Sequence, residues 1–143
     1  MAPSHVLVPL DGSPLADEAL ERALELFDCR VTVLNVVTPI DGAMSEGGIL
    51  EPGEDRCESA RDRGDRIVDR ARARATDLDR TVETAVETGD PAEAILDYVD
   101  ANDVDHVVMG GHGGQRSDIA RRLLGTVATS VVGEAPVTVT VVR

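Results

Sequence analysis

Runs of apolar residues alternate with amphipathic segments along the whole chain. The apolar runs cover residues 5–10, 31–37, 81–89, 105–110 and 136–142. Runs of this length are typical of strands, and the most continuous ones fit strands buried on both faces of a parallel sheet. Between the runs, apolar residues recur every three or four positions, which is the period of a helix. The pattern predicts an α/β fold: a doubly wound, five-stranded parallel sheet with helices on both faces and right-handed crossovers.

Two of the expected helices begin with a clear local signal. Ser13 and Asp90 are each followed directly by a proline. Each pair fits an N-cap residue followed by a proline in the first turn of a helix. The helix expected over about residues 55–76 turns small and apolar residues inward and alternates Arg with Asp elsewhere. We interpret those charged faces as a solvated ion-pair surface rather than a binding patch. Residues 38–53, rich in Gly, Pro and acids, form either a mobile surface loop or a lid over a site.

The chain is strongly acidic, with 27 Asp and Glu against 14 basic residues and a formal net charge of −13. All of the basic residues are Arg. The absence of Lys excludes a Walker-type phosphate loop and Schiff-base chemistry, and the acidity argues against nucleic acid and anionic membranes as partners. The composition also resembles that of salt-loving organisms, in which concentrated salt screens self-repulsion. An ordinary acidic cytosolic protein is the alternative.

Other features of the sequence favour a cytoplasmic protein of one domain over residues 1–143. No linker or internal repeat interrupts the pattern. Cys29 and Cys57 have no metal-ligand spacing and are expected to be free thiols. The first ten residues lack the basic head of a signal peptide, and no segment has the length of a membrane span.

Two expected strand ends carry candidate chemistry. A doubly wound sheet binds its ligand at the carboxyl ends of the strands, where the winding direction changes. Asp11, in PLDGS, ends the first strand and could accept a ribose hydroxyl or hold Mg²⁺. The same Asp-Gly-Ser is also ordinary turn and cap chemistry. The fourth strand runs into GGHGG at residues 110–114.

This glycine-rich segment has the features of a phosphate-binding loop. Glycines allow several N–H groups to turn toward one anion, and a following helix, capped by Ser117 or Asp118, would aim its positive end at the same place. Residues 106–143 carry four Arg and two acids, a net of +2, whereas residues 1–105 carry ten Arg and 25 acids, a net of −15. A phosphate cradle is favoured, and a plain strand-to-helix turn is the alternative.

Five motifs together resemble the universal stress protein family: VLVPLDGS, GDPAEAI, VVMGGHG, LLGT and PVTVTVV. The resemblance covers nearly the whole chain and is to the nucleotide-binding branch, whose signature is Gly-x2-Gly, nine residues, then Gly-Ser or Gly-Thr. It implies a Rossmann-like fold of the adenine nucleotide alpha hydrolase type and a site for ATP, AMP or ADP, with or without Mg²⁺. It also implies a homodimer through the C-terminal strand at 136–142, which would otherwise be an exposed sheet edge.

The resemblance gives roles to individual residues. Asp11 matches the acid that contacts the ribose or the metal, and Val36 matches the residue whose backbone reads the adenine. Met109 and Gly110 would flank the sugar and the phosphates. Gly110 also pairs with Gly113 in the glycine signature.

Further along the chain, Gly125, Thr126 and Val127 match the second phosphate-binding turn, while Gly89 and Pro91 match a structural turn near the same edge. The complete set of nucleotide-binding residues implied by the resemblance is Pro9, Leu10, Asp11, Val36, Met109, Gly110, His112, Gly113, Gly114, Arg116, Gly125, Thr126 and Val127.

The spacing departs from the family signature at one place. Eleven residues separate Gly113 from Gly125, and ten separate Gly114 from Gly125, where the signature has nine. The longer loop could widen the mouth of the site, bring Arg116 onto the phosphates, or distort the cradle.

The sequence favours a nucleotide-binding regulatory protein with little or no hydrolysis. His112 is the nearest candidate base, and we expect it to contact phosphate or solvent rather than to activate water. The alternative is a dimeric interaction module of the same family that binds no nucleotide, in which the glycines serve only the turn and Asp11 only the cap. A small hydrolase ranks last, because the sequence has no Gly-x-Ser-x-Gly elbow or metal triad.

Overall fold

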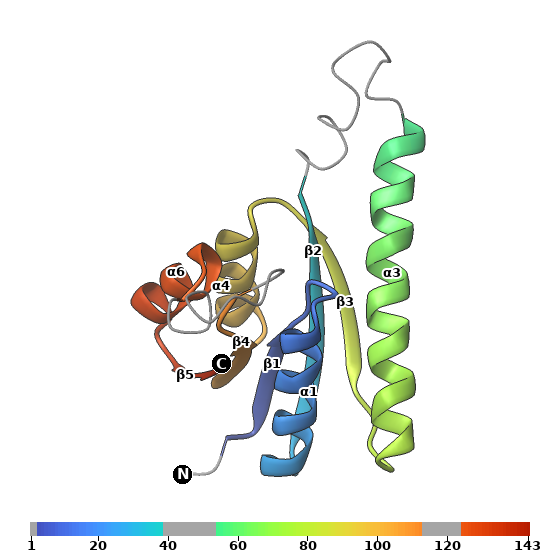
Figure 1. Ribbon diagram of the computed structural model, residues 1–143. Coiled ribbons are helices and arrows are strands. Elements are labelled where there is room, and N and C mark those ends of the chain that lie inside the picture. The colour runs from blue at the N-terminus through green and yellow to red at the C-terminus, as the bar shows by residue number, and fades with distance from the viewer. Residues whose placement is uncertain (1–2, 39–53, 113–123) are drawn as a thin grey trace.

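The expected alternation of strands and helices is present in the computed structural model, which describes residues 3–38, 54–112 and 124–143, and only the backbone of 54–58 (Figure 1). Each described strand, and the helix expected over residues 55–76, begins and ends within two residues of the predicted bounds. In chain order the elements are β1 (His5–Pro9), α1 (Pro14–Leu26), β2 (Arg30–Val37), α3 (Glu54–Asp77), β3 (Glu83–Thr88), α4 (Pro91–Ala101), β4 (His106–Gly110), α6 (Thr126–Glu134) and β5 (Thr138–Val142).

The strands form one sheet in the order β3-β2-β1-β4-β5, and every neighbouring pair is parallel. The chain first winds outward from β1 through β2 to β3, and then crosses over to β4 on the other side of β1. Helices α1 and α3 cover one face of the sheet, and α4 and α6 cover the other (Figure 1). The predicted doubly wound fold is confirmed, with its switch point between β1 and β4.

Each face of the sheet has its own aliphatic core. Along β1, Val6 and Val8 face α1 and α3, while Leu7 between them faces α4 and α6. The inward face expected for α3 is confirmed, because its small and apolar residues are buried or half-buried. These α3 residues are Ala60, Gly64, Ile67, Val68, Ala71 and Ala75.

The helix starts expected from Ser-Pro and Asp-Pro are confirmed. The Ser13 hydroxyl accepts a hydrogen bond from the Ala16 N–H at 3.3 Å, and the Asp90 carboxylate accepts one from the Glu93 N–H at 3.1 Å. In each helix the proline occupies the first turn, where no backbone donor is needed. These local caps fix the direction in which the chain leaves β1 and β3.

Helix α3 crosses β2 at a close contact that also reaches the end of β1. The buried Asn35 amide donates to the Leu10 carbonyl at 2.8 Å. A Cβ on Gly64 would lie only 2.6 Å from Asn35 Oδ1, so only glycine leaves room for the Asn35 side chain under the helix. This arrangement holds the residue directly before Asp11 in place.

A hydrogen-bonded network ties the amino ends of the first three strands together, at the opposite end of the sheet. The buried His5 ring contacts Thr32 Oγ1 at 2.8 Å through Nε2 and the Asn102 carbonyl at 3.0 Å through Nδ1. Thr32 donates to Glu83 at 3.1 Å, and Glu83 forms an ion pair with Arg30. The hydrogen bond from Arg30 holds the pKa of the Glu83 carboxyl below its usual range. Satisfied networks of this kind specify how elements join.

Among the described helices, none is both long enough and apolar enough to cross a membrane.

Candidate functional site

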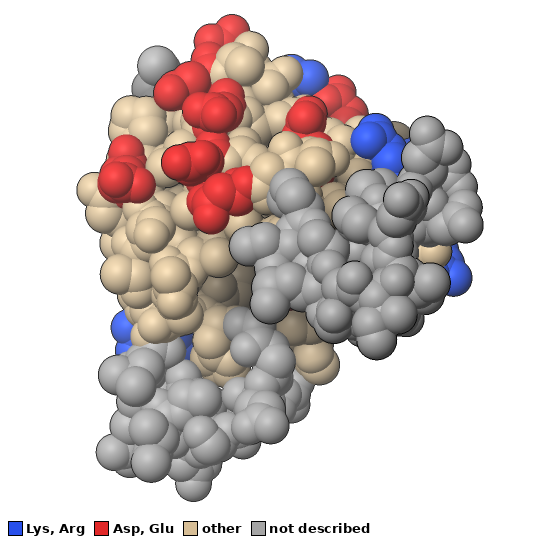
Figure 2. Space-filling model, turned by 90° about the horizontal axis from the view of Figure 1, so that it is seen from above, with Lys and Arg blue, Asp and Glu red and all other residues tan. Residues whose placement is uncertain are grey.

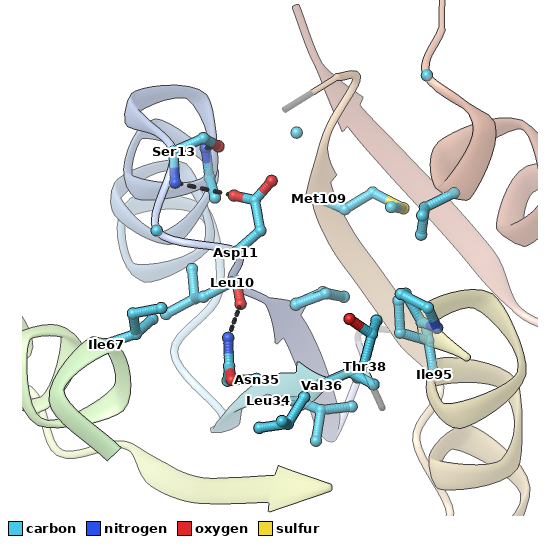
Figure 3. A pocket seen from close by; sticks show the side chains of 18 of the residues that line it. Leu10, Asp11, Ser13, Leu34, Asn35, Val36, Thr38, Ile67, Ile95 and Met109 are labelled. Carbon is cyan, nitrogen blue, oxygen red and sulfur yellow. Dashed lines mark hydrogen bonds between the residues drawn. The ribbon is translucent and has the colours of Figure 1, made fainter. Parts of the chain in front are cut away.

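A cavity of about 690 Å³ opens at the carboxyl ends of β1, β2 and β4. It lies at the switch point of the sheet, where doubly wound folds bind their ligands. Figure 3 shows the side chains of these three strand ends and of α4 pointing into one space. Its size lies within the range of small-molecule sites.

Asp11 stands at the mouth of this cavity, in the turn between β1 and α1. Its Oδ1 accepts a hydrogen bond from the Ser13 N–H at 2.9 Å, and Gly12 between them has φ +86°, a conformation that favours glycine. This oxygen accepts the hydrogen bond that is expected in an Asp-Gly-Ser turn. The side chain is nevertheless exposed and lines the cavity between Ser13 and Met109 (Figure 3), so its other oxygen can meet a ligand.

The backbone of β2 presents an unpaired edge to the cavity. The last residue of β1 pairs with Leu34, and the Leu10 N–H donates to the Leu34 carbonyl at 2.8 Å. On the other edge, the Gly89 N–H donates to the Val37 carbonyl at 2.9 Å. Because the backbone groups of successive residues point to alternate neighbours, those of Val36 face the side from which β1 has turned away. A planar base could bond to this edge.

The glycines that frame the β4 end allow backbones to approach closely. A Cβ on Gly110 would lie 3.3 Å from the backbone of Leu15 and Ala16 at the start of α1. The Gly125 N–H donates to the Gly111 carbonyl at 2.6 Å, and a Cβ on Gly125 would lie 3.3 Å from His112 Cα. The start of α6 is therefore pressed against the end of β4, with Gly125 as its N-cap.

His112 carries an unsatisfied polar atom in this region. Its Nδ1 is buried and has no hydrogen-bond partner in the part of the chain that the structure describes. Buried polar atoms almost always have a partner, and His112 lines the cavity beside Gly125 and Thr126. A ligand oxygen bound there would satisfy the ring.

The structure brings most of the predicted site residues together around this one cavity. Gly113, Gly114 and Arg116 lie outside the described residues, as do the expected caps Ser117 and Asp118 and the expected lid over most of residues 38–53. Those that line the cavity are Pro9, Leu10, Asp11, Val36, Met109, Gly110, His112, Gly125, Thr126 and Val127.

Several lining residues were not predicted as site residues. Asn35 and Ile95 were expected only as parts of a strand and of a buried helix stripe, and Pro91 as part of a structural turn. Arg63 and Arg70 of α3 also line the cavity, on a helix whose charged side chains are mostly exposed and form ion pairs, as expected. Their spacing of seven residues was visible in the sequence, but nothing there indicated which helix face would meet the site.

The charges around this end of the molecule are unevenly spread. Figure 2 looks onto it from above: the described acidic side chains in view gather on one side, and the basic ones are scattered, some of them beside the acidic group. An anionic ligand would be repelled by that acidic side. Local donors at the cavity would therefore have to offset the field of the whole chain.

Asp11 is the single carboxylate among the described lining residues. In the described parts of the chain, no group of three or more His, Cys, Asp and Glu side chains could hold a metal ion by itself. Mg²⁺ often needs only one or two carboxylates when a bound nucleotide supplies phosphate oxygens. The cavity thus fits Mg²⁺ only together with a phosphate ligand.

Comparison with protein families gives a match to the universal stress protein family over residues 3–143. The chain belongs to the universal stress protein family. A universal stress protein of Methanocaldococcus jannaschii is 29% identical over 143 residues, covering 96% of this chain and 81% of the relative.

Solved members of the universal stress protein family have the same fold. The structure of UspA from Lactobacillus plantarum superposes with a TM-score of 0.80 at 26% identity, over 100% of this chain and 99% of the other. A family member from Arabidopsis thaliana, solved with AMP bound, superposes with a TM-score of 0.70 at 22% identity, over 98% of this chain and 91% of the other.

Proposed function

We propose that this universal stress protein binds ATP, or the related ADP or AMP, in the cavity at the switch point, and acts as a stress-response regulator. The observation that carries the proposal is the convergence on one cavity of Asp11, the free Val36 backbone edge and the glycine-framed β4–α6 contact. A ribose, a base and a phosphate require these three kinds of partner. The AMP-bound plant relative supports an adenine nucleotide as the ligand.

In this arrangement each end of the nucleotide meets a different part of the cavity. The adenine bonds to the backbone of Val36, and the ribose lies near Asp11 and Met109. The phosphate chain begins at Gly110 and at the start of α6, where Thr126 and Val127 offer backbone N–H groups and the positive end of the helix. Asp11 can share Mg²⁺ with these phosphates.

Hydrolysis is expected to be slow or absent. Catalysis of phosphate hydrolysis needs a group that orients or deprotonates water. Asp11 is the one carboxylate among the described lining residues, and His112 is assigned to the ligand itself. The regulatory signal would then depend on whether the nucleotide is bound, rather than on its hydrolysis.

We also propose a homodimer formed through β5. This strand pairs with β4 on one side and with no other strand of the described chain. Such an edge is normally covered or paired, and a second copy of β5 would pair with it. The regulatory signal would then pass between two nucleotide sites.

The second candidate function is an interaction module of the same family that binds no nucleotide. It is favoured by the packing roles of Gly110 and Gly125 and by the hydrogen bond between Asp11 and Ser13, because these features have a structural use without any ligand.

Thermal unfolding with and without Mg-ATP separates the two functions. Ligand at 100 times its Kd should raise the free energy of unfolding by about 2.7 kcal/mol. Asp11→Asn keeps an acceptor for Ser13 but removes the charge, and should weaken Mg-ATP binding about tenfold. Asp28→Asn, an equal charge change at an exposed position that does not line the cavity, is the control. No shift in the wild-type protein at millimolar Mg-ATP would rule out the nucleotide function.

A further inference from the structure

One wall of the cavity is formed by a single face of α3. Ala60, Arg63, Ile67 and Arg70 all line the cavity, and their spacing places them on one side of the helix. Among the described lining residues, every Arg comes from this face, and the chain has no Lys. The positive charge that these side chains bring to the cavity thus belongs to a helix outside the glycine-rich elements.

Helix α3 reaches the same turn that carries Asp11. A Cβ on Gly12 would lie 3.3 Å from Ile67 Cδ1, so α3 packs directly against the β1–α1 turn. Met109 lies on the other side of Asp11, as Figure 3 shows. The cavity therefore continues from the end of β4, past Asp11, to the arginines of α3.

These arginines are available to a ligand. The Nη2 atom of Arg70 lies 3.5 Å from Asp17 Oδ2, and the Arg70 side chain is 54% exposed. Arg74 also pairs with Asp17, at 3.6 Å, so Asp17 keeps a partner if Arg70 turns away. Arg63 is exposed and has no acidic partner among the described residues.

Phosphate is the anion that suits such a pair. A guanidinium group binds phosphate through two parallel charged hydrogen bonds. The Asp11 carboxylate, in contrast, repels any phosphate that passes it, and the net charge of −13 adds to that repulsion. Two guanidinium groups just beyond Asp11 would offset both effects.

We infer that Arg63 and Arg70 form a subsite for the distal phosphates of a nucleoside triphosphate, which makes the cavity select ATP over AMP. The inference rests on the proposed function and deepens it. The β4 end and α6 hold the part of the nucleotide that ATP and AMP share. The α3 arginines bind the phosphates that only ATP has.

The test measures binding by calorimetry at fixed salt and Mg²⁺ for three probes: ATP, AMP and inorganic tripolyphosphate. Wild-type protein should bind ATP more tightly than AMP. The double variant Arg63→Gln/Arg70→Gln should lose about tenfold or more in affinity for ATP and tripolyphosphate, and less than about twofold for AMP. Thermal unfolding without ligand verifies that the variant folds.

The matched control is Arg61→Gln/Arg66→Gln. Both residues are exposed on the same helix, and neither lines the cavity. This pair removes the same charge and should leave all three affinities nearly unchanged. Equal losses in the two double variants would mean that only the net charge matters, and would overturn the subsite.

The outcomes for the subsite and for the nucleotide site are distinguishable. If ATP and AMP bind equally well and the α3 variant changes neither, the subsite is wrong and the nucleotide site stands. If the wild-type protein binds neither nucleotide, the proposed function is wrong. Selection of ATP over AMP is then wrong as well, and tripolyphosphate binding that depends on Arg63 and Arg70 would show only an anion site on α3.

Discussion

At the scale of single residues, Asn35 connects the fold to the site. Its amide donates to the Leu10 carbonyl, and Leu10 precedes the turn that presents Asp11. The space for this side chain exists because residue 64 of α3 has no Cβ. Asn35 and Gly64 thus position the mouth of the cavity.

Gly64→Ala should therefore destabilise the protein, although alanine normally favours a helix. The new Cβ would lie 2.6 Å from Asn35 Oδ1, so overpacking should lower the free energy of unfolding by about 1–3 kcal/mol in urea denaturation. Gly133→Ala in α6 is the matched control, because nothing lies within 4 Å of its Cβ position. That change should stabilise by up to about 1 kcal/mol. Equal effects of the two changes would contradict the close contact at Asn35.

His106 should make stability depend on pH at and below the ordinary pKa of His, about 6.5. It bonds to Thr140 Oγ1 at 2.8 Å, and its ring lies 4.7 Å from that of Phe27. Burial lowers the pKa of His106 below its ordinary value, although nearby Asp105 opposes the shift. The unfolded chain therefore takes up this proton at a higher pH than the folded chain does, so stability falls as the pH falls below the ordinary His value of about 6.5.

In His106→Gln this decline should be smaller. Urea unfolding at a series of pH values measures it, and NMR titration of the His106 ring in the wild-type protein is the independent check. Parallel stability curves for the two proteins would exclude His106 as the source.

At the scale of elements, β5 carries the proposed dimer contact. The Gly111 N–H donates to the Val142 carbonyl at 2.7 Å, which places the backbone groups of Val142 toward β4. By alternation, those of Val139 point away from β4, to the free edge of the sheet.

Val139→Pro should convert the proposed dimer to a monomer, because it removes an outward N–H without breaking a bond to β4. Sedimentation equilibrium measures the change. Val139→Thr, which keeps the N–H and the branched side chain, should remain dimeric. A monomeric wild-type protein under the same salt conditions would refute pairing through β5.

At the scale of the whole molecule, charge sets the conditions under which the fold is stable. The net charge of −13 on 143 residues creates repulsion that opposes compaction. Several ion pairs of α3 with Asp17, Glu21 and Asp69 offset it locally, but exposed pairs of this kind contribute little.

The thermal unfolding midpoint should therefore rise, on the order of 5 °C or more, between dilute buffer and molar KCl, because salt screens the repulsion. Differential scanning calorimetry across a KCl series measures the shift. An unchanged midpoint would show that the acidic composition is no adaptation to salt.

The sequence predicted features that depend on neighbouring residues. Ser13 and Asp90 were recognisable as caps because a cap and its partners lie within four residues. The strands of the sheet were recognisable because burial on both faces leaves a continuous apolar run. Asp11 was selected as a polar residue at the end of the first strand, whereas Val36 and Gly125 were selected through the resemblance to a family. Their convergence on one cavity required the fold.

The sequence alone determined the order of the elements, the helix faces that turn inward, and the excess of negative charge, because periodicity, capping and composition are properties of local sequence. Only the tertiary structure decided that α3 brings Arg63 and Arg70 to the cavity, that Gly64 makes room for Asn35, and that Val36 is left with a free edge. These relations join positions far apart in the chain. They follow from strand order and helix packing, in which each contact depends on the placement of all the others.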